Sequence, residues 1–232
     1  MKKITLILFV LFASTLKSQI WIDLGIKGGY LPTLALNNNL INDKTNKLGM
    51  GTSYLYGAKI GVNFNQEYSV CSEVLFTTLS PINKNSLSLN YIQIPILFRY
   101  NQDNGSYSEI GPQISLFRGA KSDGTDVQDQ FTSTNYDIVA GLGQYIGGGN
   151  GFGFNLGVRV ACNLNDIIGS EFRTEEGNAV FTPVETDATP LSDFKYNATR
   201  NLYVGIVLEF NFNLGYFQKG PNCHNKTRFK LF

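Results

Sequence analysis

The sequence predicts an all-β protein, an eight-stranded antiparallel up-and-down transmembrane β-barrel. Eight segments alternate between apolar and polar residues with a period of two, which is typical of strands with two unlike faces. The connections between these segments alternate between long and short. Charged residues make up only 16% of the chain, and glycine is plentiful at 24 residues. The polar face is therefore built mainly from small residues. A single domain of 232 residues accommodates such a barrel.

The N-terminus predicts an export signal. Lys2 and Lys3 precede an apolar run from Ile4 to Ala13, and the small residue Ser18 offers a cleavage point. This run is too short to span a bilayer, because a membrane helix needs about 20 residues. We therefore expect three parts, which are a signal peptide at 1–18, an outer-membrane β-barrel at 19–214 and a C-terminal periplasmic tail at 215–232.

The expected strands of the first half cover residues 22–30, 53–64, 68–77 and 92–100. The second of these strands shows the clearest alternation. Its apolar face consists of Tyr54, Tyr56, Ala58, Ile60, Val62 and Phe64, and its other face of Ser53, Leu55, Gly57, Lys59, Gly61 and Asn63. The second half repeats the pattern at residues 109–116, 136–143, 152–160 and 201–212. Strands of this length with one apolar and one small or polar face match membrane barrels.

The connections support the same topology. We expect long connections at 31–51, 79–86, 119–135 and 165–199, and short ones at 65–67, 101–106 and 147–150. Outer-membrane barrels place short turns in the periplasm and long loops outside the cell. We therefore expect both termini to be periplasmic. The glycine-rich stretch Gly147–Gly151 fits a hairpin better than a phosphate-binding loop, because no helix follows it.

Aromatic residues favour the two ends of the expected strands over their middles. Five lie on the apolar face near the long connections, namely Tyr30, Tyr54, Tyr56, Phe76 and Tyr136. Eight lie on that face near the short turns, namely Phe64, Tyr68, Phe98, Tyr100, Phe152, Phe154, Phe210 and Phe212. Two such rings are typical of membrane interfaces. The rival fold is a soluble barrel with an apolar interior, but its water-facing side would need many more Lys and Glu residues.

Several stretches resemble the outer-membrane β-barrel domain family of Bacteroidota, which includes PorT-like and small porin-like proteins. The resemblance rests on Tyr91–Tyr100 with its Ile-Pro pair, Ile110–Gln113, Asp137–Gly143, and Val158–Val160 followed by Asn163–Ile167. It would cover roughly residues 19–214. The family implies the barrel fold and a location in the outer membrane of a Gram-negative bacterium. It implies no single shared activity, although PorT-like proteins suggest a role in protein secretion.

The polar face of the expected barrel collects charges from all eight strands. They are Asp23, Lys27, Lys59, Glu73, Arg99, Glu109, Asp137, Arg159 and Glu209. Side chains fill the interior of an eight-stranded barrel, and buried charges must be paired. We therefore expect an ion-pair network that closes the barrel and stabilises it. A narrow gated ion path and a pair of catalytic carboxylates are the alternatives.

The sequence predicts no enzyme. The only histidine, His224, lies in the expected tail, so the strands and loops lack the usual general base. Cys223 and His224 are too few for a metal site, and we expect no metal and no cofactor. A net charge of +1 gives no reason to expect nucleic acid.

We expect a structural or accessory protein of the cell envelope, with outer-membrane lipid and envelope or secretion-system proteins as partners. The long connection at 165–199 is either a recognition loop or a solvated lid. A small porin for ions or solutes is the first alternative function. An outer-membrane barrel enzyme that hydrolyses lipid or peptide is the second.

Overall fold

The computed structural model describes residues 21–36, 51–80, 87–122, 124–149, 152–167 and 198–214. The expected signal peptide, the expected tail with Cys223 and His224, and most of the connection at 165–199 lie outside these residues.

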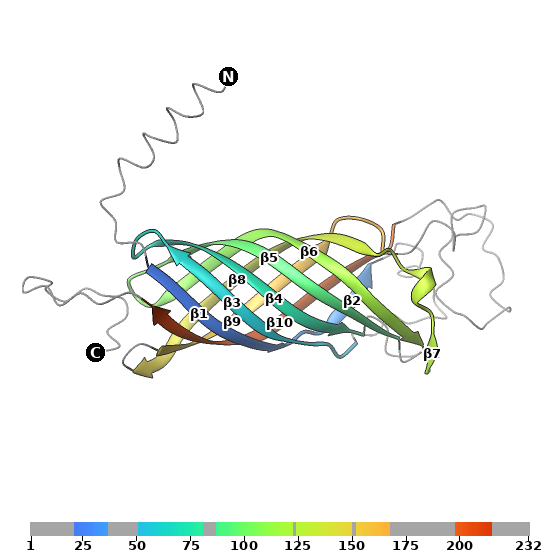
Figure 1. The fold of residues 1–232 in the computed structure, drawn as a ribbon, viewed down its shortest axis with the longest axis horizontal. Coiled ribbons are helices and arrows are strands. Elements are labelled where there is room, and N and C mark those ends of the chain that lie inside the picture. The colour runs from blue at the N-terminus through green and yellow to red at the C-terminus, as the bar shows by residue number, and fades with distance from the viewer. Residues whose placement is uncertain are drawn as a thin grey trace, which may run out of the picture.

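Eight long antiparallel strands form a closed barrel, as the sequence predicts (Figure 1). They are β1 (Trp21–Tyr30), β3 (Tyr54–Asn63), β4 (Tyr68–Leu79), β5 (Ser88–Asn101), β6 (Ser106–Ser122), β8 (Thr134–Gly149), β9 (Phe152–Asn163) and β10 (Arg200–Leu214). Each strand pairs with its neighbour in this order. The barrel closes because β1 also pairs with β10, from Ile22 opposite Leu214 to Tyr30 opposite Ile206.

Two short strands and one helical turn lie at the end of the barrel with the long connections (Figure 1). Strand β2 (Thr33–Leu36) pairs with the start of β10, β7 (Thr125–Asp126) pairs with the end of β6, and a 3-10 helix covers Gln128–Gln130. The connections expected at 31–51 and 119–135 are therefore partly regular structure. Strand β6 continues to Ser122 because β5 offers backbone partners opposite it, as where Ser88 faces Lys121.

The short connections lie at the other end of the barrel. The connection expected at 147–150 begins later than predicted, because β8 continues to Gly149, which pairs with Phe152. A register shift between Tyr145 and Gly147 adds one residue to β8 at this point. Strands β8 and β9 thus form the predicted hairpin, whose two central residues lie outside the described part. Long and short connections alternate along the chain, as predicted.

The apolar faces of the strands point outward. Ile26 is 62% exposed and Leu142 is 66% exposed, whereas the polar residues between the outward positions are buried. This arrangement excludes the rival barrel with an apolar interior and a polar outer face. Within the described residues, no helix is long and apolar enough to cross a membrane.

The aromatic residues form two outward-facing groups, as predicted. Near the long connections, Tyr56 stacks on Phe76 with ring centroids 5.6 Å apart. Near the short turns, Tyr68 stacks on Phe98 at 5.7 Å, and Phe154 lies 4.7 Å from Phe210. Aromatic rings at these two levels match the two interfaces of a bilayer.

The interior is less polar than the sequence suggested. Several apolar residues share the inward face with the charges and are buried, among them Leu55, Leu75, Leu97, Val139 and Val207. Alternation identifies which residues point inward, but it does not require all of them to be polar. The interior therefore combines buried polar groups with apolar packing.

Candidate functional site

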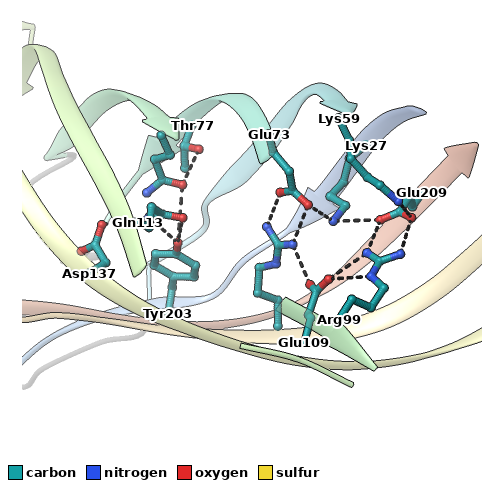
Figure 2. A network of polar contacts seen from close by, with 12 residues as sticks. Lys27, Lys59, Glu73, Thr77, Arg99, Glu109, Gln113, Asp137, Tyr203 and Glu209 are labelled. Atoms are coloured by element: carbon teal, nitrogen blue, oxygen red, sulfur yellow. Dashed lines mark hydrogen bonds and ion pairs between the residues drawn. The ribbon is translucent and has the colours of Figure 1, made fainter. Parts of the chain in front are cut away.

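The interior of the barrel is the candidate functional site. All nine charged residues predicted to point inward are buried there. Eight of them are joined by ion pairs at the level of Glu73 and Glu209, as Figure 2 shows for most of the group. This set is named the charge cluster below and consists of Asp23, Lys27, Lys59, Glu73, Arg99, Glu109, Arg159 and Glu209.

Glu209 on β10 lies between three cations. Its carboxylate oxygens lie 2.9 Å from the Lys27 ammonium, 2.7 Å from the Lys59 ammonium and 2.8 Å from Arg99 Nη1. The side-chain amides of Asn155 and Asn211 also donate hydrogen bonds to Oε1. The carboxylate is thus surrounded by donors and has no exposed side-chain surface.

Arg159 on β9 joins two further carboxylates. Its guanidinium donates to both oxygens of Glu73, from Nη1 at 2.7 Å and from Nη2 at 2.9 Å. Nη2 also lies 2.6 Å from Glu109 Oε1. A bidentate contact of this kind fixes the orientation of the guanidinium and of the carboxylate. Arg99 binds the other oxygen of Glu109 at 2.7 Å, which connects this half of the cluster to Glu209.

The charges of the cluster cancel. Four cations (Lys27, Lys59, Arg99, Arg159) face four carboxylates (Asp23, Glu73, Glu109, Glu209), so the formal sum is zero. Removing a charge from water costs several kcal/mol, and pairing with good geometry offsets this cost. The members of the cluster therefore stabilise the folded barrel together, since the loss of any one of them leaves a buried charge without its counterpart.

Asp137 on β8 lies apart from the charge cluster (Figure 2). It accepts hydrogen bonds from Gln113 at 2.8 Å, from Asn163 at 2.9 Å and from Ser115. No basic side chain of the described residues forms an ion pair with it. The expectation that all nine charges join one network is wrong at this position. On β8 it is Gly141 that faces Glu109 and Arg159, and Asp137 lies nearer the long connections.

Tyr107 was not singled out by the sequence, although it completes the cluster. The Arg99 guanidinium lies 4.1 Å from the centre of its ring, which is a cation–π contact. The side chain lies over Gly143 and Gly157: a Cβ atom at Gly143 would come within 2.3 Å of the ring, and one at Gly157 within 2.6 Å of the hydroxyl oxygen. These two glycines face each other across β8 and β9, and the room that they leave is filled by the aromatic ring.

A small polar recess leads from the short-turn end to the charge cluster. It has a volume of about 30 Å³, and Lys59, Arg99 and Tyr107 are among its lining residues. This volume is close to the space of a single water molecule. The recess therefore ends at the cluster, with Lys59 and Arg99 in its wall.

The opposite mouth of the barrel is covered by apolar residues from the ends of the long connections. The buried residues there are Leu31, Leu79, Leu87, Leu89, Ala120, Val127 and Ile167, with Phe117 and Phe131 packed against them. Backbone hydrogen bonds join the connections, from Thr132 N to Ile167 O at 2.9 Å and from Ile167 N to Thr199 O at 3.0 Å. This set is named the apolar cap below. It separates the polar interior from solvent on that side.

The described residues contain no group of three or more His, Cys, Asp or Glu side chains placed to hold a metal ion. Among the cysteines, Cys71 is buried and Cys162 is partly exposed, and both are free.

The model of the family described as outer membrane protein beta-barrel domain matches residues 10–169. The chain belongs to this family. It is therefore an outer-membrane β-barrel protein. The match spans β1 to β9, and the strand order reported above completes the barrel with β10.

The chain is also similar in structure to small outer-membrane proteins. Neisserial surface protein A is 10% identical with a TM-score of 0.46, and the match covers 80% of this chain and 95% of that chain. OprG from Pseudomonas aeruginosa is 12% identical with a TM-score of 0.45, covering 85% and 98%. Ail of Yersinia pestis is 10% identical with a TM-score of 0.38, covering 81% and 97%. None of the curated proteins compared with the chain matches it.

Replacing Glu209 should destabilise the barrel strongly. In Glu209→Gln, three cations keep their charge and lose a shared carboxylate, so we expect the free energy of unfolding to fall by about 3–5 kcal/mol. Urea unfolding of the protein folded in lipid vesicles measures this change. The matched control is Glu67→Gln at an exposed short turn, which should change stability by less than about 0.5 kcal/mol. Equal effects of the two substitutions would show that the cluster contributes nothing specific.

Proposed function

We propose that this protein is a closed outer-membrane barrel with a structural or accessory role in the cell envelope, which holds its long connections in place for contact with other envelope components. The charge cluster carries this proposal. It occupies the barrel interior, and the side chains of Lys27, Glu73, Arg159 and Glu209 have no exposed surface. An aqueous pore needs a hydrated lining, whereas these charged side chains are removed from water and paired with one another.

The apolar cap supports closure independently of the charges. Water or ions that cross the barrel would have to pass Leu31, Leu89 and Ile167, each of which has 0% exposed area. Two barriers of different chemistry thus lie in series along the barrel axis. The alternative of a small porin requires both barriers to move.

Closure predicts a lack of conductance. The purified protein in planar bilayers should give no stable channels, because the charge cluster fills the interior. The double variant Glu73→Ser with Arg159→Ser removes a matched ion pair at constant net charge and should raise ion flux. Its control, Glu67→Ser with Lys121→Ser, removes two exposed charges and should stay silent. Reproducible large channels from the unaltered protein would contradict closure and favour the small porin.

We further propose that the long connections face the cell exterior and both termini face the periplasm. Strand β1 begins and β10 ends at the same end as the short turns, as Figure 1 shows. Outer-membrane barrels place their short turns in the periplasm. This orientation places β7 and the apolar cap at the outer side of the membrane.

The orientation predicts a labelling pattern. In a background with Cys71, Cys162 and Cys223 replaced by Ser, a membrane-impermeant maleimide should label Asp126→Cys in intact cells and leave Gln102→Cys unlabelled. Both positions are exposed, at β7 and at a short turn, so their intrinsic accessibility is matched. Permeabilised cells should show labelling of both. The reverse pattern in intact cells would place the long connections in the periplasm.

A secretion-associated role is the finer version of the proposal. Its support is the resemblance of the strand motifs to the Bacteroidota family with PorT-like members. The partner would be an envelope or secretion-system protein that contacts the long connections or the C-terminal tail.

A further inference from the structure

A groove lies on the outer wall of the barrel near the long connections. It has a volume of about 350 Å³ and spans β3, β4, β5 and β6. Its outward-facing lining residues are Tyr54, Tyr56, Phe76, Thr78, Asn90, Ile92 and Arg118. Since this wall faces the bilayer, the groove opens toward lipid and lies outside the barrel interior.

Strand register divides the groove into two levels. Tyr54 lies opposite Thr78, which lies opposite Asn90, and these three polar residues form the level nearer the long connections. One step toward the middle of the barrel, the same strands present a second row with Tyr56, Phe76 and Ile92. The groove is therefore polar near the long connections and apolar nearer the middle of the barrel. A lipid in the bilayer presents its headgroup and its acyl chains in the same order.

A bulge in β6 directs Arg118 into the polar level. Tyr91 pairs with Phe117 and Asn90 pairs with Gly119, so Arg118 is the extra residue that has no partner in the ladder. Phe117 turns inward to Tyr91, with ring centroids 5.6 Å apart, while Arg118 stays exposed. No carboxylate of the described residues forms an ion pair with Arg118.

The polar level offers hydrogen-bond donors. The Thr78 hydroxyl donates to Asn90 Oδ1 at 2.9 Å, which occupies the amide oxygen and leaves its N–H groups for a ligand. The Tyr54 hydroxyl and the Arg118 guanidinium are further donors. No Asp or Glu among the described residues lines the groove. A site with one cation, several donors and no carboxylate selects an anion, and arginine binds phosphate well.

We propose that this groove binds the headgroup phosphate of a membrane lipid, held by Arg118 and Asn90, with an acyl chain lying on Tyr56, Phe76 and Ile92. Tyr56 is 58% exposed and Phe76 is 46% exposed, and this apolar level favours a lipid over free phosphate. On the orientation proposed above, the lipid is a phosphorylated glycolipid of the outer leaflet. The site would give the barrel a fixed lipid contact at the headgroup level.

Native mass spectrometry of the full chain folded in detergent tests the site. The probes are monophosphoryl lipid A and the same glycolipid without its phosphate. The unaltered protein should retain the phosphorylated lipid preferentially, and Arg118→Gln should weaken its retention about ten-fold, because it removes a charge-assisted contact. The matched control is Lys121→Gln, which removes an exposed cation three residues further along the same strand and should leave retention unchanged.

Three results would overturn the proposal. Equal retention of the two glycolipids would show that the phosphate is not recognised. Equal effects of the Arg118 and Lys121 substitutions would show only general attraction of anions. Displacement of the lipid by inorganic phosphate at the same concentration would show a free-anion site. Because detergent has no leaflets, these outcomes do not depend on orientation, and the cysteine labelling alone decides which leaflet the groove faces.

Discussion

Mutual neutralisation of buried charges is the constraint on which the rest of this barrel depends. Eight strands enclose a space that side chains fill, so an inward charge must find an ion-pair partner within that space or, like Asp137, be satisfied by neutral hydrogen-bond donors. Seven of the eight long strands supply a member of the charge cluster, and β8 supplies Gly141 instead. A Cβ atom at Gly141 would lie 2.9 Å from the Glu109 side chain, so the missing side chain makes room for the cluster. Strand pairing and ion pairing thus fix the same register.

The cluster also determines which functions suit the fold. In the closed barrel that we propose, the charges of the cluster satisfy one another, and the apolar cap covers the other side. In that barrel, contacts with lipids or with other proteins would be made by the outer wall and the long connections. On the wall, the aromatic groups mark two interface levels, and the groove beside Arg118, which we propose as a lipid site, lies at one of them.

The sequence predicted the fold because two patterns can be recognised without knowing how the strands are paired. These are the alternation of apolar and polar residues within each strand and the alternation of long and short connections. It also identified which charges point inward, since parity along a strand is a local property. The height of a residue along the barrel axis depends on register between strands, so Asp137 was placed wrongly with the other charges. For the same reason the packing of Tyr107 over two glycines was missed. The outward turn of Arg118 depends on a bulge that alternation does not reveal.

A double-mutant cycle on Arg159 and Glu73 tests most directly whether the charge cluster acts as a unit. Unfolding free energies are measured for Arg159→Met, Glu73→Gln and the double variant in lipid vesicles. Each single variant leaves buried charge uncompensated, whereas the double variant removes the matched pair, so we expect a coupling energy of about 2–3 kcal/mol. Strictly additive effects would contradict the account, because they would mean that these side chains share space in the interior without stabilising each other.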